Sequence, residues 1–183
     1  MFDFFKNWQR KRILTQMKSV RRSKKIANIN DVHTIGLVFT VGEESHWTLL
    51  YHFAKLMEDL GKKVMMIGLQ EADTTLDYII THSQTIICRE KEDLDKLGFP
   101  KAGTVERFTN QHFDLLIDTT VEPNFFAQYV VLKTLADLKV TYADVNEEEY
   151  DDDIFDLTIQ GEGSINHREY LNNVVQYLKM IQK

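Results

Sequence analysis

The stretch FDLLIDTTVEPNFFAQYVVLKTLADLKVTYAD, residues 113–144, decides the fold of this 183-residue chain. Residues 113–117 are almost continuously apolar, which is typical of a strand covered on both faces. Asp118 ends that run, because a polar side chain at the end of a buried strand cannot stay inside unpaired. We therefore expect the chain to leave the sheet at this point.

The residues after that strand predict a helix and a second strand. Pro123 suits a first helical turn, where its missing N–H costs nothing, and apolar residues recur at helical spacing from Phe125 to Leu138. Residues 138–143 then predict the return strand. Because crossovers between parallel strands are right-handed, residues 113–144 are expected to form the central β-α-β unit of a parallel sheet.

Strands and helices alternate through the remainder of the chain. The strand pattern recurs at residues 33–41, 63–68, 85–88 and 154–160, and the helix pattern at 45–60, 75–80, 104–111 and 167–181. Gly61 is expected to cap the first of these helices in a left-handed conformation, and Asn166 with Glu169 predicts a capping box. We predict an α/β three-layer sandwich with a mainly parallel, Rossmann-like sheet of five or six strands, in the order 3-2-1-4-5 with the sixth strand at the edge.

Residues 1–30 are expected to form a basic helix and a connector, and residues 31–183 a single α/β domain. Residues 2–25 contain no Pro or Gly and predict one long helix. The first 25 residues hold nine Lys and Arg and one acid, a charge of +8. The whole chain has 22 basic and 28 acidic residues, so 13 and 27 remain elsewhere, a charge of −14. Parts with such opposite charges attract each other or bind different partners.

Three interpretations of the basic helix stay open. It packs on its own domain or contacts a partner protein or a second copy; it lies on an anionic membrane; or it binds nucleic acid. Phe, Trp and Met in a leading helix favour contact with protein, whereas Phe and Trp beside Lys and Arg are typical of a membrane interface. Nucleic acid is not expected as a partner, because the acidic body would repel phosphate.

The location of the protein is predicted from what the sequence lacks. No run of residues approaches the ~20 apolar positions that a membrane span needs, and the N-terminus has no uninterrupted apolar segment of a secretory signal. Cys88 is the single cysteine, and its place in TIICR predicts a small buried strand residue. We expect a cytoplasmic protein, with residues 1–25 offering peripheral contact to the inner membrane.

Polar residues gather where the first and fourth predicted strands end. In open parallel sheets, ligands bind beyond the carboxyl ends of the strands at the switch point, where the strand order reverses. His46 with Asp118 or Glu43 would supply the residue types for an acid–base pair or a divalent-metal site there. The candidate ligand-binding residues around them are Glu43, Ser45, Thr119, Thr120, Glu122 and Asn124. The competing interpretation is structural, because these residue types also cap helices and complement helix dipoles.

The motifs indicate no particular cofactor or metal. The turn VGEES, residues 41–45, has one glycine and two acids, whereas phosphate-binding loops are rich in glycine. The acidic segment 144–156 lacks the glycine and the spacing of an EF-hand, and we expect it to be solvated or to dock the basic helix. The histidines occur singly, without metal-binding spacing, and His167 is expected to face solvent.

Several of these segments resemble a domain-of-unknown-function family from Bacteroidetes. The segments that carry the resemblance, over nearly the whole chain, are the basic N-terminal helix, IGLVF at 35–39, KxxxxxLGFP at 91–100, FDLLIDT at 113–119, FDLTI at 155–159 and QYLKMI at 176–181. These are core strands and helix ends with no catalytic signature. The resemblance therefore implies a fold and transfers no activity or catalytic residue.

A looser similarity connects residues 113–119 with an FDLxIDL strand in one Rossmann-like half of heptose-type glycosyltransferases. Those enzymes bind the nucleotide sugar mainly through a second half, for which this chain has no room, so a stand-alone transferase is not expected. The sequence predicts a small non-catalytic α/β binding or interaction module whose basic helix contacts a partner protein or a membrane. The alternative is an enzyme, or a nucleotide or small-molecule binder, that uses the switch point.

Overall fold

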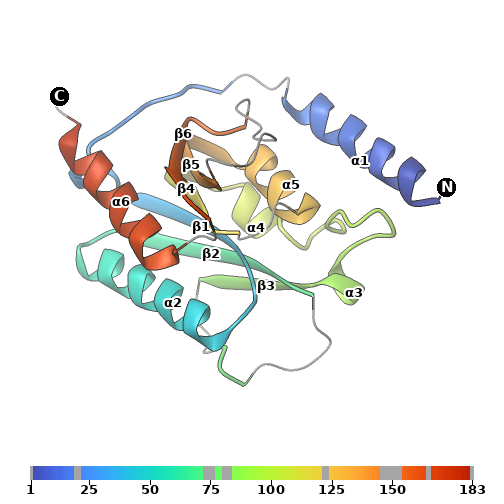
Figure 1. Ribbon diagram of the computed structural model, residues 1–183, viewed down its shortest axis with the longest axis horizontal. Coiled ribbons are helices and arrows are strands. Elements are labelled where there is room, and N and C mark those ends of the chain that lie inside the picture. Colours follow the sequence, from blue (N-terminus) through green and yellow to red (C-terminus); the bar gives the residue numbers. More distant parts are fainter. Residues whose placement is uncertain are drawn as a thin grey trace.

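The structure, a computed structural model, describes residues 2–18, 22–71, 77–79, 84–120, 124–144, 154–163 and 166–181. Its centre is a six-stranded sheet in the order β3-β2-β1-β4-β5-β6, with every neighbouring pair parallel (Figure 1). The strands are β1 (Thr34–Thr40), β2 (Lys63–Gln70), β3 (Thr85–Arg89), β4 (His112–Asp118), β5 (Leu135–Asp144) and β6 (Leu157–Gly161). The predicted strand order is confirmed, including the sixth strand at the edge.

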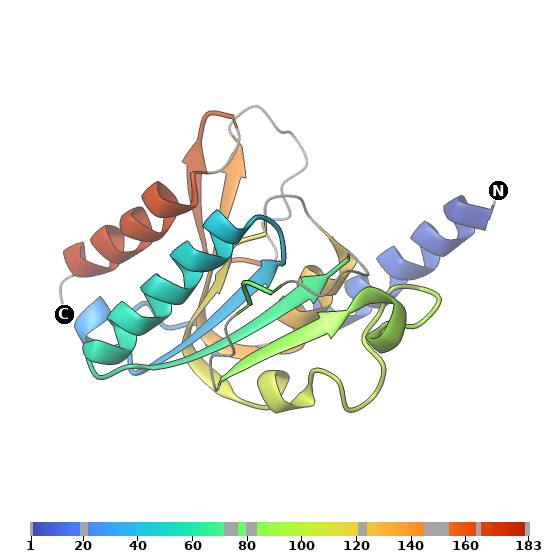
Figure 2. The ribbon, with the colours of Figure 1, turned by 90° about the horizontal axis from the view of Figure 1, so that it is seen from below.

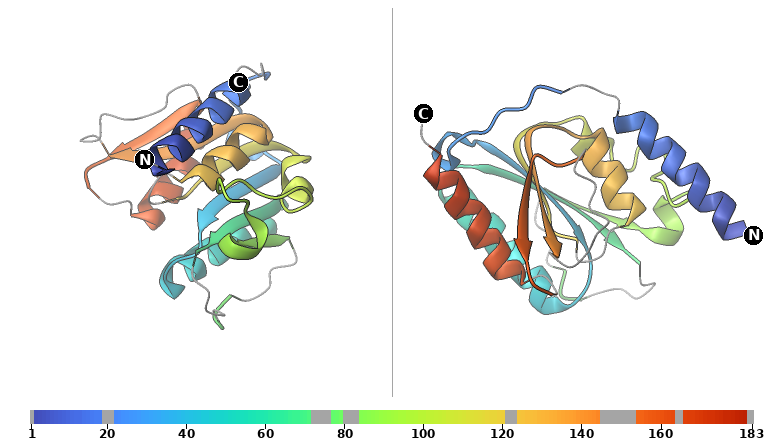
Figure 3. Two further views of the ribbon diagram at one scale, coloured as in Figure 1. Left: turned by 90° about the vertical axis from the view of Figure 1, so that its right-hand side faces the viewer. Right: turned by 45° about the horizontal axis from the view of Figure 1, so that its top comes forward.

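Helices cover both faces of this sheet. They are α1 (Phe2–Lys18), α2 (Glu44–Asp59), α3 (Glu90–Asp93), α4 (Glu106–Thr109), α5 (Phe125–Lys133) and α6 (His167–Met180), with a 3-10 turn η1 (Ile29–Asp31) before β1. α2 and α6 pack on one face, and α4 and α5 on the other (Figures 1 and 2). α1 lies outside α5, and its amino end points away from the domain (Figure 3). The three-layer α/β sandwich is confirmed, with α1 as an addition outside it.

The two central strands are buried on both faces. Ile35 and Leu115, neighbours across β1 and β4, are fully buried in the cluster under α2 and α6. Gly36 makes room on the opposite face, since a Cβ at that position would lie 2.7 Å from Cδ1 of Leu116 and 3.0 Å from the Phe108 ring. Covering by helices on both sides explains why these strands have continuous apolar runs rather than alternating ones.

The crossover helix after β4 is shorter than predicted. The helical spacing extended to Leu138, but α5 ends at Lys133, and β5 begins at Leu135, three residues before the predicted strand at 138–143. The hydroxyl of Thr134 donates to the carbonyl oxygen of Val130 (2.6 Å), and the backbone becomes extended at Thr134. The ladder with β4 then begins at Leu135. Residues 135–137, which the local pattern assigned to the helix, therefore form strand because they pair with β4 in the sheet.

The N-terminal helix is also shorter than predicted. α1 ends at Lys18 rather than at residue 25, and residues 22–28 are not helical. The N–H of Lys25 donates to the carbonyl oxygen of Asp137 in β5 (3.0 Å). β6 pairs with β5 only from Val140 onward, so the first part of that strand edge has carbonyl groups that this segment satisfies. Tertiary hydrogen bonding therefore outweighs helix propensity here.

Other boundaries follow the predictions within a few residues. β6 begins at Leu157 rather than at residue 154. Gly61 has φ +80° and ends α2, as predicted. The predicted helix at 75–80 lies outside the described residues except for 77–79, which are not helical. The acidic segment 144–156 is described only at Asp144 and at residues 154–156.

Candidate functional site

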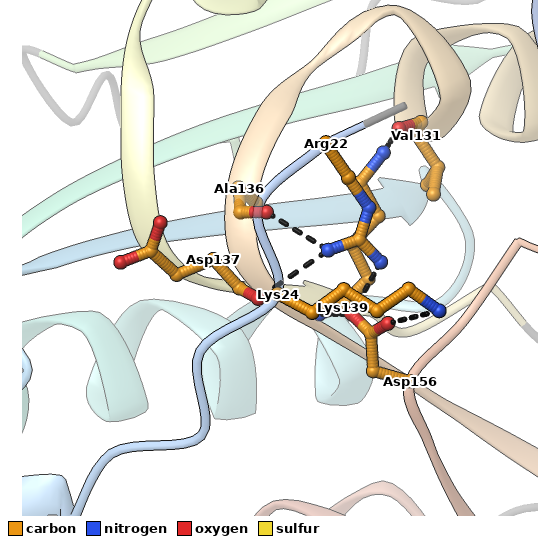
Figure 4. Close-up of polar contacts among 7 residues, drawn as sticks. All are labelled: Arg22, Lys24, Val131, Ala136, Asp137, Lys139 and Asp156. Carbon is orange, nitrogen blue, oxygen red and sulfur yellow. Dashed lines mark hydrogen bonds and ion pairs between the residues drawn. The ribbon is translucent and has the colours of Figure 1, made fainter. Parts of the chain in front are cut away.

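A buried carboxylate holds the segment that follows α1. Asp156 pairs with the guanidinium of Arg22 and with the ammonium of Lys24 (3.1 Å) (Figure 4). The same guanidinium donates to the carbonyl oxygens of Ala136 (3.0 Å) and Asp137 (3.3 Å) in β5. Burial would raise the pKa of the Asp156 carboxyl, but hydrogen bonds from Arg22, from the backbone of β5 and from Lys24 outweigh it and lower that pKa. An ionised Asp156 therefore fixes the N-terminal segment to the edge of the sheet.

Lys139 lies beneath this ion pair, with 2% of its surface exposed. Its Nζ donates to the carbonyl oxygen of Val131 in α5, and its backbone N–H donates to the carboxylate of Asp156 (2.8 Å) (Figure 4). Burial, aided by the charge of Arg22, lowers the pKa of Lys139 to about 7, although Asp156 acts in the opposite direction. The Lys139 amine is enclosed by protein, so Lys139 helps to attach the N-terminal segment to the sheet rather than to react with solutes.

The inner face of α1 binds the helix to its own domain. Leu14 is buried, with 5% of its surface exposed. Arg10 donates to the carbonyl oxygen of Leu97, and its guanidinium carbon lies 4.4 Å from the centre of the Phe125 ring at the start of α5. These contacts fix the rotation of α1 about its long axis, and this rotation determines which side chains face outward.

The outer face of α1 combines an aromatic ring with cations. Trp8 is 50% exposed. Lys11, Arg12 and Thr15 are exposed as well, and lie on the same side of the helix at spacings of three, four and seven residues from Trp8. The guanidinium carbon of Arg12 lies 5.7 Å from the centre of the Trp8 ring. This stripe, called the Trp8 face below, is a composite apolar and cationic surface.

Two histidines meet at the switch point, where α2 and α6 begin. The ring centroids of His46 and His167 are 3.7 Å apart. Nε2 of His167 donates to the carbonyl oxygen of Thr119 (3.0 Å), whereas Nε2 of His46 is buried and has no hydrogen-bond partner among the described residues. Burial and then the charge of His167 lower the pKa of His46 to about 4, and burial lowers the pKa of His167. His46 is therefore neutral at pH 7.

Asp118 precedes the threonine that His167 contacts. It is 8% exposed, and its Oδ1 accepts from the N–H of Thr120 (3.0 Å). Burial raises the pKa of the Asp118 carboxyl to about 6, although the hydrogen bonds from Thr120 act against it. Within the described residues no hydrogen bond joins Asp118 to His46, so their acid–base pair stays a prediction. A carboxyl with a pKa of about 6, one residue before the threonine that His167 contacts, has a residue type suited to proton transfer.

Two predicted ligand-binding residues hold the strand ends in place. Asn124 accepts from the N–H of Ala127 (2.8 Å) as the N-cap of α5, and its amide donates to the hydroxyl of Thr40 at the end of β1 (3.0 Å). Thr119 is fully buried, and its hydroxyl donates to the carbonyl oxygen of Val38 (3.0 Å). Both side chains join β1 to the end of β4 or the start of α5, which is the structural role that the sequence offered as a competing interpretation.

Three of the remaining predicted site residues, Glu43, Ser45 and Thr120, lie at the rim of the switch point. Ser45 and Glu43 are exposed, and the hydroxyl of Ser45 donates to the Glu43 carboxylate (3.3 Å). Thr120 is half-buried and contacts Asp118 as described above. Glu122 lies outside the described residues.

The sequence pattern of one known family matches residues 3–181. The chain belongs to DUF6913, a family of unknown function. The match confirms the predicted relationship to a domain of unknown function, and DUF6913 assigns no activity. Comparison with the curated proteins gives no match. Within the described residues, no helix is long and apolar enough to cross a membrane, and no three His, Cys, Asp or Glu residues form a group that could hold a metal ion.

The structure of this DUF6913 chain corrects one prediction and adds residues that the sequence did not indicate. His167 was expected to face solvent, but it is half-buried against His46, because α2 and α6 begin side by side. Lys139 had a weak signal as a lysine between apolar residues in a predicted strand, whereas Arg22 had none. Cys88 is fully buried as predicted, and burial raises the pKa of its thiol to about 12, which disfavours a role as nucleophile.

Proposed function

We propose that this chain is a non-catalytic cytoplasmic binding module that attaches to an anionic membrane surface through the Trp8 face. The observation that carries the proposal is the position of Trp8, half exposed beside Lys11 and Arg12 on a helix whose other side is bound to the domain. Trp is enriched at membrane–water interfaces, and Lys and Arg add attraction to anionic headgroups. Attachment would be peripheral, with the helix in the plane of the surface.

The charge distribution supports a membrane rather than nucleic acid as the partner. Arg22 and Lys24 are occupied by Asp156, whereas Lys11 and Arg12 face outward. The rest of the chain, residues 26–183, carries a charge of −14, the difference between its 13 basic and 27 acidic residues. Repulsion of this part of the chain is screened beyond about 8 Å at physiological salt, so a helix on the outside of the domain can touch an anionic surface. A phosphate backbone that wrapped the domain would be repelled.

The test is binding to vesicles of phosphatidylcholine with and without phosphatidylglycerol. The full chain should float with the anionic vesicles and be released by salt, and Trp8 emission should shift to shorter wavelength, because Trp47 is already buried. Lys11→Glu with Arg12→Glu should weaken binding by at least about tenfold, since each cation near the surface contributes about 1 kcal/mol.

The matched control is Arg168→Glu with Lys179→Glu, a double charge reversal at exposed positions of α6, which packs on the face of the sheet opposite α5 and α1. It should bind like the unmodified chain. Equal binding to neutral and anionic vesicles, or equal loss in both double variants, contradicts the proposal. Self-association or capture of a protein partner that depends on Trp8 without any vesicle binding would replace the membrane by a protein.

A second candidate function is the binding of a nucleotide or other small molecule at the switch point, with His46 and Asp118 in acid–base roles. The observation that favours it is the buried Nε2 of His46, which has no hydrogen-bond partner among the described residues and which a bound molecule could satisfy. Native mass spectrometry of the purified chain, compared with His46→Ala, tests it. A bound mass that disappears in the variant supports this function, and the absence of any bound mass at near-physiological nucleotide concentrations contradicts it.

A further inference from the structure

The sheet has a cavity of about 600 Å³ at its amino edge, opposite the switch point. It opens where β1, β2 and β4 begin, between the end of α2 and the short α4. Its walls are formed by Thr34, Glu58, Lys62, Lys63, Val64, Met65, Gln84, Arg107, Gln111, His112 and Phe113. This volume lies within the range of roughly 300–1,000 Å³ that is usual for small-molecule sites.

The cavity combines an apolar floor with a cationic rim. The floor residues Val64, Met65 and Phe113 are buried strand residues. Lys62, Lys63 and Arg107 contribute three basic side chains, and Glu58 is the one acid in the lining. Because residues 26–183 carry a charge of −14, this net positive lining is a local exception on an acidic domain. Such a field concentrates anions and excludes cations.

The polar groups of the rim differ in how far they are committed to the protein itself. Lys62 is committed, because its Nζ donates to the carbonyl oxygens of Ile29 (2.7 Å) and Val32 (2.8 Å). Arg107 donates from one terminal nitrogen to the side-chain oxygen of Gln84 (3.1 Å), which holds its guanidinium at the cavity. Lys63 is exposed, and its ammonium makes no contact with a described residue that would prevent it from turning toward a ligand.

Glu58 offsets only part of this charge, because the lining holds three basic side chains and one acid. Its carboxylate is directed to Lys55 at 2.9 Å, on the solvent side of α2. His112 is held by Asp137 (2.9 Å between Nε2 and Oδ1) and closes one side of the rim. The positive charge that a ligand would meet is therefore mainly that of Lys63, at the start of β2, and of Arg107, on α4.

We propose that this cavity binds a small organic anion, a carboxylate or phosphate monoester carried on an aromatic or other apolar group. Lys63 and Arg107 bind the anionic group, and the apolar group rests on Val64, Met65 and Phe113. Neutral polar solutes lack the charge, and inorganic anions lack the part that covers the floor. The site is separate from the Trp8 face and from the switch point, so it stands or falls independently of the functions proposed above.

Phenyl phosphate is the probe, titrated into the full chain by calorimetry and followed by amide chemical shifts in NMR. Saturable binding should shift the amides of residues 63–65, 107 and 111–113. Lys63→Gln and Arg107→Gln should each weaken binding by about fivefold or more, as expected for loss of one charge-assisted hydrogen bond. Lys96→Gln, a lysine on the exposed turn after α3, is the matched control and should change the affinity less than about twofold.

Three outcomes overturn the proposal. One is the absence of saturable binding of phenyl phosphate; the second is a set of shifted amides that centres on α1 or on the switch point; the third is equal binding by Lys63→Gln, Arg107→Gln and Lys96→Gln. Inorganic phosphate should bind about tenfold more weakly than phenyl phosphate, because it leaves the apolar floor uncovered. Equal affinity for both would remove the apolar half of the proposal. Unchanged urea midpoints of the variants show that the fold is intact.

Discussion

Asp118 and Asp156 are two buried carboxyl groups at strand ends, and their pKa values shift in opposite directions. Each lies at an end of a strand, one closing β4 and the other just before β6, and each is inaccessible: Asp118 is 8% exposed and the Asp156 side chain 5%. Burial raises the pKa of Asp118 to about 6. The pKa of Asp156 is lowered, because Arg22, the backbone of β5 and Lys24 outweigh the same effect of burial.

The difference lies in what each carboxyl faces. Asp156 meets two cations that come from far away in the sequence, so its charge is stabilised and becomes an anchor. Asp118 accepts from Thr120 and has no cation against it within the described residues, so its charged form is costly. A buried carboxyl that is uncompensated in this way is typical of a binding site, and one that is fully paired is typical of structure.

The largest expected effect is that of Asp156→Ala. The change leaves the Arg22 side chain, of which 13% is exposed, buried without its carboxylate, and we expect it to lower the free energy of unfolding by about 3 kcal/mol. Urea denaturation followed by circular dichroism measures it. The segment after α1, residues 22–28, should detach from the edge of β5, and faster proteolysis near residue 20 would detect this. A loss below about 1 kcal/mol would mean that Asp156 is not an anchor.

The opposite sign is expected for Asp118→Asn. The pKa of Asp118 is about 6 in the folded protein, against an ordinary value of 3.8. The free energy of unfolding of the unmodified protein therefore falls as pH rises from about 4 to 6, and the loss is complete above pH 6. The amide has the same shape and can still accept from Thr120. We expect the variant to gain about 2 kcal/mol at pH 8 and nearly nothing below pH 4. A destabilised variant at pH 8 would remove the contrast with Asp156.

The histidine pair is expected to give a pH dependence of the reverse sense. His46 has a folded pKa of about 4, so stability is complete above its ordinary value of 6.5 and is lost as pH falls from 6.5 to 4. In the Asp118→Asn background, where the carboxyl no longer titrates, the loss should be about 2 kcal/mol, and His46→Gln should remove most of it. His52→Gln, an exposed position on the same helix, is the control. Equal slopes in both variants would show that the stacked pair is not responsible.

The smallest effect is expected for Lys24→Ala. Lys24 shares the carboxylate of Asp156 with Arg22, but its side chain is 61% exposed. Exposed ion pairs contribute little, so we expect a loss of less than about 0.5 kcal/mol, measured by the same urea titration as for Asp156→Ala. If Lys24→Ala were as damaging as Asp156→Ala, the anchor would depend on total charge rather than on the buried guanidinium.

The architecture was predictable because it rests on local patterns. The continuous apolar runs at 35–39 and 113–117 identify strands covered on both faces, and the rule of right-handed crossovers orders them. Boundaries were less predictable where hydrogen bonds of the sheet compete with helical spacing, as at Leu135, where β5 begins inside the predicted helix. The end of α1 at Lys18 has the same cause, since the segment after it binds β5.

The candidate sites, like the fold, were predictable in part and depended in part on tertiary contacts. The topology rule brought His46 and Asp118 to one edge of the sheet from their positions in the sequence. It could not show that His167 would stack on His46, because that contact depends on how α6 packs beside α2. Nor could it show the cavity of the opposite edge, whose rim joins Lys63 at the start of β2 to Arg107 on α4.

By itself, the sequence determined the class of fold, the order of the strands, the basic N-terminal helix and the place where two strand ends meet. These depend on hydrophobic periodicity and charge, which are properties of neighbouring residues. Only the tertiary structure decided which charges are paired. It gave Asp156 its cations and left Asp118 without any within the described residues, because the energy of a buried charge depends on groups brought near it by folding. It also decided which face of α1 is presented to a partner, since Leu14 and Arg10 hold the other face against the domain.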